Sequence, residues 1–270
     1  MLDFDVQIKD FIYGMNGIYK RYADDIIIVV PVVKDIEISF ENIEEKIKDT
    51  LKVYAGIHGN LAKPGYNPWL IKFASSLDNK DIGAQEYVYS KIAKDAGIEM
   101  PETHLFPSKN CVGHFGVKRF DRIGSQKVHI HTACGLLHAN HRTSSINYDG
   151  LLKLTSILTK DVREVEKMVR LMIFNVKAGN KDDHSKNFSF MLDKNNNWKM
   201  TPAYDLTPSQ GINGEQTSMV NGKGTDITDS DLIKTAVPFG FAEKKVSAII
   251  EQTNDALANY DKYMKELGVK

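Results

Sequence analysis

A dense polar stretch directly after an amphipathic helix constrains this chain more than any other feature. Asn180-Lys-Asp-Asp-His-Ser-Lys-Asn187 packs two acids, two amides, a histidine and two lysines into eight residues. Asp161 predicts the N-cap of the preceding helix, with Glu164 in the acidic position three residues later, and Gly179 predicts its end. Read alone, the stretch is a solvated turn, so its meaning depends on partners elsewhere in the chain. The helix itself is expected to be buried, because it carries a wide apolar stripe: Val162, Val165, Val169, Met172, Ile173 and Val176.

Length and charge bound the class of protein. The chain has 270 residues, 42% of them hydrophobic, which is enough for one large domain or two lobes with a sizeable core. Its 35 basic and 35 acidic residues cancel, so no bulk charge draws it to nucleic acid or to an anionic membrane. We therefore predict neither direct nucleic-acid binding nor membrane association.

Cysteine content and the first residues indicate the compartment. Cys111 and Cys134 make no disulfide framework, which is typical of a reducing cytosol. The segment Met1–Asp5 carries acids where a signal peptide carries bases, and no apolar run approaches the roughly 18 residues of a membrane span. We expect a cytoplasmic protein; action in a target-cell cytosol after secretion by a special route stays open.

A lysine and a glutamate upstream are spaced like a known ion pair. Trp69–Phe73 predicts a strand in which Lys72 is the one charged residue and must find a partner or water. Apolar spacing from Ile82 predicts a helix that ends at Gly97, with Glu86 in its first turns. A strand lysine followed by a helix glutamate is the order of the pair that holds ATP phosphates in protein kinases. An edge-strand lysine and an exposed glutamate are the alternative.

The first 65 residues carry weaker signals. Ile26–Val30 has strand length, Ile36–Phe40 alternates with period two, and apolar spacing predicts a helix from Ser39. Gly56 and Gly59 precede the Lys72 strand, where a glycine loop can cover phosphates with its backbone N–H groups. On this segment alone, a plain turn is the alternative.

Two further segments precede the polar stretch. His114–Arg122 predicts a strand that ends in charged residues. In a two-lobed kinase, the chain crosses between the lobes at this point and its backbone contacts the adenine. His129–His141 is expected to be an ordinary helix that buries Ala133, Leu136 and Leu137. The alternative for this second segment is a zinc site, whose ligands would be His131, Cys134, His138 and His141.

A hairpin and another acid follow the polar stretch. Phe188–Leu192 and Trp198–Thr201 predict two strands, and Asp205 stands at their exit. Protein kinases supply a catalytic-loop Asp, an Asn five residues later for metal, and a second metal-binding Asp after a short hairpin. Asp182, Asn187 and Asp205 have this spacing, after a lysine, a glutamate, a hinge strand and a buried helix in kinase order.

This order predicts an α+β, two-lobed protein-kinase-like fold. Residues 1–120 would form a small β-containing N-lobe with the glycine-rich loop, the lysine strand and the glutamate helix. Residues 121–270 would form a mainly helical C-lobe with the catalytic loop and the metal-binding acid, a loop over 207–230, and helices from 229 to the end.

Within the polar stretch, roles can be divided. Asp182 is the predicted catalytic base, because it is five residues before Asn187; Asp183 competes but is only four before it. His184 is expected to support the loop, and Lys186 either contacts the γ-phosphate or faces solvent. Phosphoryl transfer also needs oxygen ligands for magnesium, which Asn187 and Asp205 can supply.

At these residues the chain resembles the HipA-type serine/threonine kinases of bacterial toxin–antitoxin systems. The resemblance runs from about Tyr54 to the C-terminus, and its last two motifs are highly specific. The matching segments are Trp69-Leu-Ile-Lys-Phe73, Glu86-Tyr87, Ala93…Ala96-Gly97-Ile98, Pro101-Glu-Thr103, Lys118-Arg-Phe-Asp-Arg122, Phe174-Asn175, Gly179-Asn-Lys-Asp-Asp-His-Ser-Lys-Asn-Phe-Ser-Phe190 and Pro202-Ala-Tyr-Asp-Leu206.

The resemblance implies ATP, magnesium and phosphorylation of serine on a protein, with aminoacyl-tRNA synthetases as the family's targets. It implies Asp182 as base, Asn187 and Asp205 as magnesium ligands, and Lys72 on the ATP phosphates. It also implies that the segment Lys118–Asp121, which includes Phe120, lies at adenine and ribose.

Two departures from the family pattern bear on partners and regulation. Full-length members begin with a small N-terminal subdomain for which 270 residues leave no room, so we expect a short form with a separate HipS-like or HipB-like antitoxin. The family's glycine-rich loop carries an autophosphorylated serine, but Tyr54–Gly65 has no Ser or Thr. Loop autophosphorylation is then absent, or it uses another site such as Ser75, Ser144 or Ser145.

Two other functions fit the same residues. One is a small-molecule or lipid phosphotransferase of kinase-like fold, since such enzymes share the Asp-x4-Asn loop. The other is a weakly active scaffold that binds an antitoxin and, through it, DNA. Retention of Lys72, Asp182, Asn187 and Asp205 argues against a dead kinase.

Overall fold

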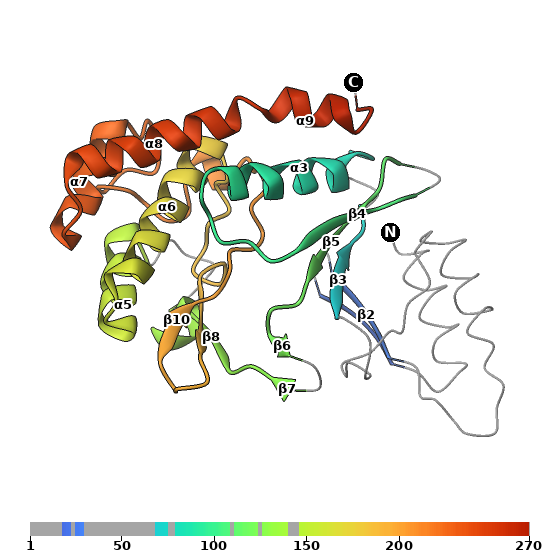
Figure 1. Ribbon diagram of the computed structural model, residues 1–270, viewed down its shortest axis with the longest axis horizontal. Helices are drawn as coiled ribbons and strands as arrows, with labels where there is room; N and C mark the ends of the chain where they lie inside the picture. The colour runs from blue at the N-terminus through green and yellow to red at the C-terminus, as the bar shows by residue number, and fades with distance from the viewer. Residues whose placement is uncertain are drawn as a thin grey trace. The chain divides into compact units, whose positions relative to one another are not determined.

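A computed structural model describes residues 18–22, 25–29, 68–74, 79–108, 111–123, 126–139 and 146–269 (Figure 1). The chain divides into two compact units. Unit 1 comprises Met1–Tyr87, Glu102–Gln126 and Met264–Lys270, and unit 2 comprises Val88–Pro101 and Lys127–Tyr263. Helices and strands occur in both, so the predicted mixture of α and β structure is confirmed.

Unit 1 contains a three-stranded antiparallel sheet in the order β3-β5-β4, built from β3 (Trp69–Lys72), β4 (Thr103–Phe106) and β5 (His114–Lys118). The strands predicted at 69–73 and from 114 are therefore confirmed. Position 116, in the central strand, requires glycine because a Cβ there would come within 2.2 Å of the Phe106 ring. Lys72 pairs opposite Phe115, which fixes its place on the sheet.

Two further strand pairs follow, of which the second ends where unit 2 begins again at Lys127. β1 (Ile18–Tyr22) pairs with β2 (Asp25–Val29), which confirms the strand predicted from Ile26. β6 (Arg122–Ile123) pairs with β7 (Gln126–Lys127). The strand predicted at 36–40, the helix predicted from Ser39 and the glycine loop all lie outside the described residues.

The helix predicted from Ile82 is present as α3 (Ile82–Asp95). Ala84, Val88 and Ile92 recur at four-residue spacing and are completely buried. Gly97 adopts a left-handed conformation with φ 77°, as a residue that terminates a helix requires.

The helices of unit 2 surround the segment that leads to the polar stretch. In Figure 1, α6 (Val162–Ala178) lies between α5 (Tyr148–Thr159) and α8 (Glu243–Leu257). Asp161 caps α6 by accepting from the Arg163 N–H at 2.9 Å, and Gly179 ends it with φ 71°. The predicted start and end of this helix are confirmed. The remaining helical segments here are α4 (Ala133–Leu136), η1 (Ile212–Gly214), α7 (Asp229–Ala236), η2 (Val237–Phe239) and α9 (Tyr260–Glu266), which ends in unit 1.

The buried stripe of α6 differs from the predicted one at both ends, since Val162 is exposed and Val176 is only partly buried. Val162 is 61% exposed, because it occupies the first turn, whereas Val165, Met168, Val169 and Met172 are buried. The helical pattern from Phe241 likewise divides into α8 and α9, with Ile249 and Ile250 buried as expected.

The expected helix over His129–His141 is wrong for its first half. Residues Ile130–Thr132 form β8, which pairs with β9 (Ser189–Leu192), and β9 pairs with β10 (Trp198–Met200). Backbone pairing with β9 outcompetes the local helical pattern, so Ala133 is buried but Leu137 is 45% exposed. The predicted hairpin is confirmed, with β8 added as a third strand. No helix in the described ranges is long and apolar enough to cross a membrane.

Candidate functional site

The polar stretch forms a loop that starts where α6 ends. The left-handed Gly179 reverses the chain, and the Asn180 N–H donates to the Asn175 carbonyl at 2.9 Å. The loop closes on itself because the Asn187 N–H donates to the His184 carbonyl at 2.8 Å. The residues between them are therefore held as one compact turn.

Asp182 presents its carboxylate to solvent from a fixed backbone. Its side chain is 63% exposed. Its N–H donates to Ser209 Oγ at 2.8 Å, and its carbonyl accepts from Asn187 Nδ2 at 2.9 Å. His184 Nε2 lies 4.0 Å from Asp182 Oδ1. The side chain of Asp182 is thus accessible to a substrate while both peptide groups around it are hydrogen-bonded.

Asp183, the competing acid, points the other way. It is completely buried, its Oδ2 accepts from the Tyr148 hydroxyl at 2.6 Å, and its Oδ1 accepts from the Ser218 N–H at 3.0 Å. Burial raises the pKa of Asp183 to about 7, although hydrogen bonds from Tyr148, Gln216 and Ser218 oppose that shift. A carboxyl enclosed in this way cannot meet an acceptor hydroxyl, which favours Asp182.

A chain of buried polar side chains continues from Asp183 under the loop. Asn175 Nδ2 donates to the Tyr148 hydroxyl at 3.0 Å, and Asn180 Nδ2 donates to Asn175 Oδ1 at 3.1 Å. The same amide of Asn180 donates to the carbonyl of Asp205 at 3.3 Å. Because each buried group has a partner, this network supports the loop without leaving an unsatisfied polar atom among these bonds.

Lys186 and His184 contribute differently. The Lys186 carbonyl accepts from the Tyr204 hydroxyl at 2.6 Å, and that hydroxyl also contacts Ser189 Oγ at 2.6 Å. Burial and the nearby charge of Asp205 raise the pKa of Tyr204 to about 12, so its hydroxyl stays a donor. His184 is 25% exposed, which suits a residue that supports the loop.

Asp205 adopts an unusual backbone conformation. Its φ is 58°, in the left-handed region that costs most non-glycine residues about 1–2 kcal/mol and Asp or Asn less. Such strain persists only where the surroundings hold it, and the Asn180 bond to its carbonyl is one such restraint. Tyr204, bound to the Lys186 carbonyl, ties the preceding residue to the loop.

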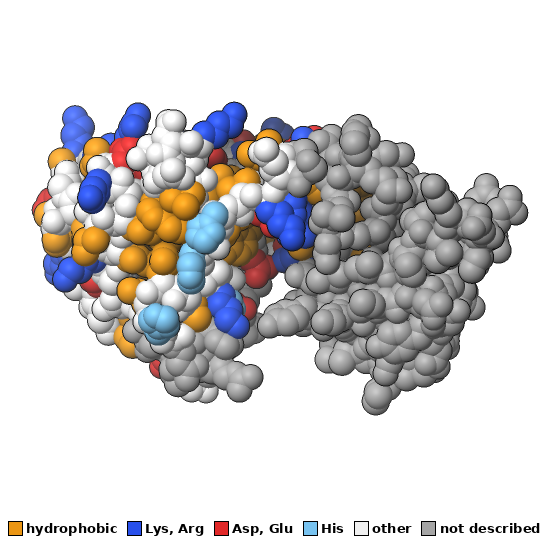
Figure 2. All heavy atoms as spheres, turned by 90° about the horizontal axis from the view of Figure 1, so that it is seen from below, with side chains coloured by type: hydrophobic (Ala, Val, Ile, Leu, Met, Phe, Trp, Pro, Cys, Tyr) orange, Lys and Arg blue, Asp and Glu red, His pale blue; other side chains and the backbone are white. Residues whose placement is uncertain are grey.

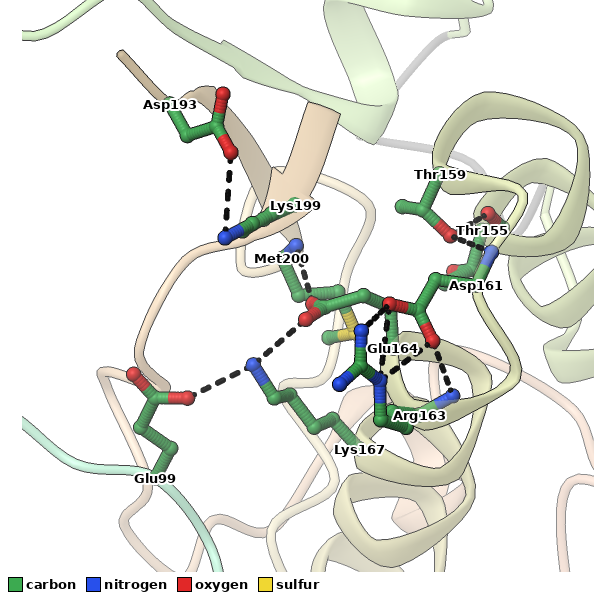
Figure 3. Close-up of polar contacts among 10 residues, drawn as sticks. All are labelled: Glu99, Thr155, Thr159, Asp161, Arg163, Glu164, Lys167, Asp193, Lys199 and Met200. Atoms are coloured by element: carbon green, nitrogen blue, oxygen red, sulfur yellow. Dashed lines mark hydrogen bonds and ion pairs between the residues drawn. The ribbon is translucent and has the colours of Figure 1, made fainter. Parts of the chain in front are cut away.

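Glu164 anchors the hairpin that leads to Asp205 (Figure 3). Its Oε2 accepts from the Met200 N–H at 2.8 Å and its Oε1 pairs with Lys167 Nζ at 2.9 Å. Lys167 Nζ also pairs with Glu99 Oε2 at 2.9 Å. The side chain of Glu164, the acid three residues after the N-cap, is 7% exposed; it turns into the core and holds β10.

Unit 1 brings together the predicted lysine and glutamate. Lys72 Nζ lies 2.7 Å from Glu86 Oε1, with side-chain exposures of 22% and 9%. A buried carboxylate is stable only with such a partner, so the alternative of an exposed glutamate is wrong. The pair leaves the lysine on a strand edge, partly accessible to a ligand.

The segment predicted to bind adenine and ribose is held by its own charges. Lys118 Nζ pairs with Glu102 Oε2 at 3.0 Å, and Asp121 accepts from both Arg119 and Arg122. Burial alone would raise the pKa of Asp121, but the two guanidiniums lower it below its ordinary value. Phe120 lies in the turn between these residues. Gly56 and Gly59 lie outside the described residues.

The alternative zinc site finds no support among the described side chains. Figure 2 shows histidines among apolar side chains on one face of the molecule. Within the ranges that the structure describes, no three His, Cys, Asp or Glu residues are grouped so that they could hold a metal ion. His131 instead packs beside Gly135, and His141 falls in an undescribed segment.

Comparison with solved structures defines the class of fold. A chain of the Shewanella oneidensis MR-1 toxin–antitoxin complex of HipA, HipB and operator DNA superposes with a TM-score of 0.63 and 16% identity. The match covers 90% of this chain and 68% of that one. The model of the HipA-like C-terminal domain matches residues 43–260. The chain belongs to the HipA-like C-terminal domain family, as the resemblance in its motifs predicted.

The chain is also similar to two curated proteins that are named as kinases. "Putative kinase Y4dM" of Sinorhizobium fredii is 25% identical over 203 residues, which cover 68% of this chain and 49% of the relative. "Putative kinase" of Haemophilus influenzae is 27% identical over 139 residues, which cover 46% of this chain and 40% of the relative. The chain thus spans about half or less of the length of these two relatives.

Several residues that shape the site had no signal in the sequence. Tyr148 and Ser209 contact the loop from positions 27 or more residues away, and Gln216 and Ser218 do so from a segment without periodicity. The helix α5, which carries Tyr148, could have been found from its Asn147 cap and its leucines.

Proposed function

We propose that this chain is a serine/threonine protein kinase that uses ATP and Mg²⁺. The observation that carries the proposal is the exposed Asp182, held by Ser209 and Asn187 in an Asp-x4-Asn loop and followed by a hairpin and Asp205. This arrangement matches what phosphoryl transfer needs from a protein, which is a positioned base and oxygen ligands for metal.

In the proposed reaction, Asp182 accepts the proton of the acceptor hydroxyl. The hydroxyl oxygen then forms a bond to the γ-phosphorus of ATP, the bond from that phosphorus to the bridging oxygen breaks, and ADP leaves. The buried Asp183 supports Asp182 only through the backbone that they share. His184, whose Nε2 lies 4.0 Å from Asp182 Oδ1, supports the orientation of the base. Lys186 is available to balance charge on the γ-phosphate.

The donor set fits a magnesium ion. Asn187 uses its Nδ2 to donate to the Asp182 carbonyl, so the amide oxygen of Asn187 remains for a cation. Asp205 adds a carboxylate, and Mg²⁺ is commonly held by one or two such groups together with substrate phosphates. When bound, the ion would neutralise charge on the phosphates during transfer.

Unit 1 supplies the proposed nucleotide contacts. Lys72, oriented by Glu86 at 2.7 Å, would contact ATP phosphates. Lys118, Phe120 and Asp121 would contact adenine and ribose, and Gly56 and Gly59 would cover the phosphates. A two-lobed arrangement, with residues 1–120 as N-lobe and 121–270 as C-lobe, is part of this proposal.

The biological role that we propose is that of a toxin. Membership of the HipA-like family and the likeness to a chain from a toxin–antitoxin complex support it. The protein substrate would be translation-related, such as an aminoacyl-tRNA synthetase, and a small HipS-like or HipB-like protein would be the antitoxin. The cytoplasm is the proposed place of action.

A transfer assay tests the activity. Wild type, Asp182→Asn and the exposed Asp255→Asn control are incubated with labelled ATP, Mg²⁺ and a cell lysate. We expect a discrete labelled protein with wild type and the control, and a loss of roughly 100-fold or more with Asp182→Asn.

Other outcomes favour other functions. Label only in small molecules or lipids would indicate a phosphotransferase of that class, and no transfer would indicate an antitoxin-binding scaffold. Expression in bacteria tests the toxin role separately: wild type should arrest growth, whereas Asp182→Asn should not, and equal growth would contradict it.

A further inference from the structure

Two segments of unit 2 exchange hydrogen bonds in both directions. Ser209 Oγ accepts from the N–H of Lys181 at 2.9 Å and from the N–H of Asp182 at 2.8 Å. The Ser209 N–H donates to the Gly179 carbonyl at 3.0 Å. In return, Asn180 Nδ2 donates to the carbonyl of Asp205 at 3.3 Å. These hydrogen bonds therefore hold the start of the loop against the segment from Asp205 to Ser209.

The hydroxyl of Ser209 makes a specific contribution to this set of hydrogen bonds. Lys181 and Asp182 follow the end of α6, so their N–H groups have no helical acceptor, and one hydroxyl oxygen satisfies both. Thr217 binds the other side of the Lys181 peptide, where its hydroxyl donates to the Lys181 carbonyl at 2.8 Å. Ser209 is thus the side chain that holds the Asp182 N–H.

This contact matters because Asp182 is exposed. Because 63% of the Asp182 side chain is exposed, its position depends in part on the backbone that carries it, in addition to contacts such as the one with His184 Nε2 at 4.0 Å. That backbone is held by Ser209 at its N–H and by Asn187 at its carbonyl. A shift of about 1 Å in a reacting group can lower a rate by roughly 100-fold, so fixing this peptide has a catalytic consequence.

We infer that Ser209 is a positioning residue, which holds Asp182 in line for proton transfer and, with Asn180, sets its place relative to Asp205. The catalytic part of this inference rests on the proposed function, in which Asp182 is the base. The structural part, that the Ser209 hydroxyl immobilises the amides of Lys181 and Asp182, does not.

The test compares Ser209→Ala, Ser209→Thr and the matched control Ser247→Ala, an exposed serine of α8, in the full chain. Release of ADP from ATP with Mg²⁺, with water as the acceptor of the phosphoryl group, gives kcat and KM. Hydrogen–deuterium exchange follows the peptide that spans residues 180–187. We expect Ser209→Ala to lower kcat roughly 10-fold to 100-fold with an unchanged KM for ATP. Its exchange in that peptide should be roughly 10-fold faster.

Rescue separates positioning from a general loss of structure. Ser209→Thr keeps the hydroxyl and should restore both kcat and exchange, and Ser247→Ala should match wild type. Unchanged exchange and kcat in Ser209→Ala would overturn the inference. So would faster exchange throughout unit 2 with a lowered melting temperature, since that describes a purely structural role.

The same data distinguish this inference from the proposed function. A wild-type protein that binds ATP but releases no ADP and labels no protein in the lysate would overturn the proposed function, and the catalytic role of Ser209 with it. The exchange of the 180–187 peptide in Ser209→Ala would still decide whether the hydroxyl holds the loop.

Discussion

The Tyr148 hydroxyl donates to Asp183 Oδ2 at 2.6 Å, and both residues are completely buried. This bond joins α5 to the loop that carries Asp182. Burial and the charge of Asp183 raise the pKa of Tyr148 well above its ordinary value, so the tyrosine keeps its proton and acts as a donor at neutral pH. Asp183 is therefore a supporting residue whose own protonation affects stability.

Asp183→Asn should flatten the pH dependence of stability. The pKa of Asp183 is raised from 3.8 to about 7 by burial, so between these values the folded protein binds a proton that the unfolded chain has released. Stability then falls as pH rises through this window, by at most about 1.4 kcal/mol per pH unit. Urea unfolding at several pH values from 4.5 to about 7.5 measures the slope.

The exposed Asp255→Asn serves as the control for that experiment, since it changes a carboxylate without burial. The slope of the free energy of unfolding against pH is compared between wild type and Asp183→Asn. The difference between the two slopes gives the contribution of Asp183, separate from that of other titrating groups. An identical slope in both would show that Asp183 does not carry the proton.

Glu164→Ala should destabilise the protein by about 2–4 kcal/mol. The substitution removes the acceptor of the Met200 N–H and one of two carboxylates that pair with Lys167. Glu164→Gln should cost less, because its amide oxygen can still accept from Met200. Chemical denaturation measures both, with the exposed Glu251→Ala as control; equal stability of all three would contradict the anchoring role.

A charge swap separates the structural and catalytic parts of the Lys72–Glu86 pair. Lys72→Met leaves a carboxylate with a 9% exposed side chain without its cation, so it should lower both the melting temperature and ATP-dependent transfer. The double variant Lys72→Glu, Glu86→Lys restores the pair and should recover stability. It should not recover transfer, because a glutamate repels ATP phosphates.

Lys153→Met, at an exposed position of α5, is the control for the charge swap. Recovery of transfer in the double variant, measured with labelled ATP, would show that Lys72 supports the fold and not the nucleotide.

Asp205→Asn and Asp205→Ala distinguish conformation from metal binding. The backbone φ of 58° suits Asn at least as well as Asp, whereas Ala should cost about 1 kcal/mol. We expect Asp205→Asn to melt like wild type and Asp205→Ala to melt lower, while both lose Mg²⁺-dependent transfer. A wild-type magnesium requirement in Asp205→Asn, measured by titration, would exclude Asp205 as a ligand.

Local patterns predicted much of the secondary structure. The strand at Trp69–Lys72 and the helices α3 and α6 were predictable because periodicity, Asp161 and Gly179 are properties of neighbouring residues. The pairing of Lys72 with Glu86 was also predictable from their order. The helix expected over His129–His141 was wrong, since β8 forms by pairing with a strand about 60 residues later.

The sequence by itself determined most of the elements, β8 excepted, and which residues are available for chemistry, including the spacing of Asp182, Asn187 and Asp205. Only the tertiary structure decided that Asp182 faces solvent and Asp183 is buried, because adjacent identical residues differ only in what surrounds them. It also decided the contacts of Ser209 and Glu164. Those bonds join residues that are far apart in the sequence, and no local sequence pattern encodes a contact between such residues.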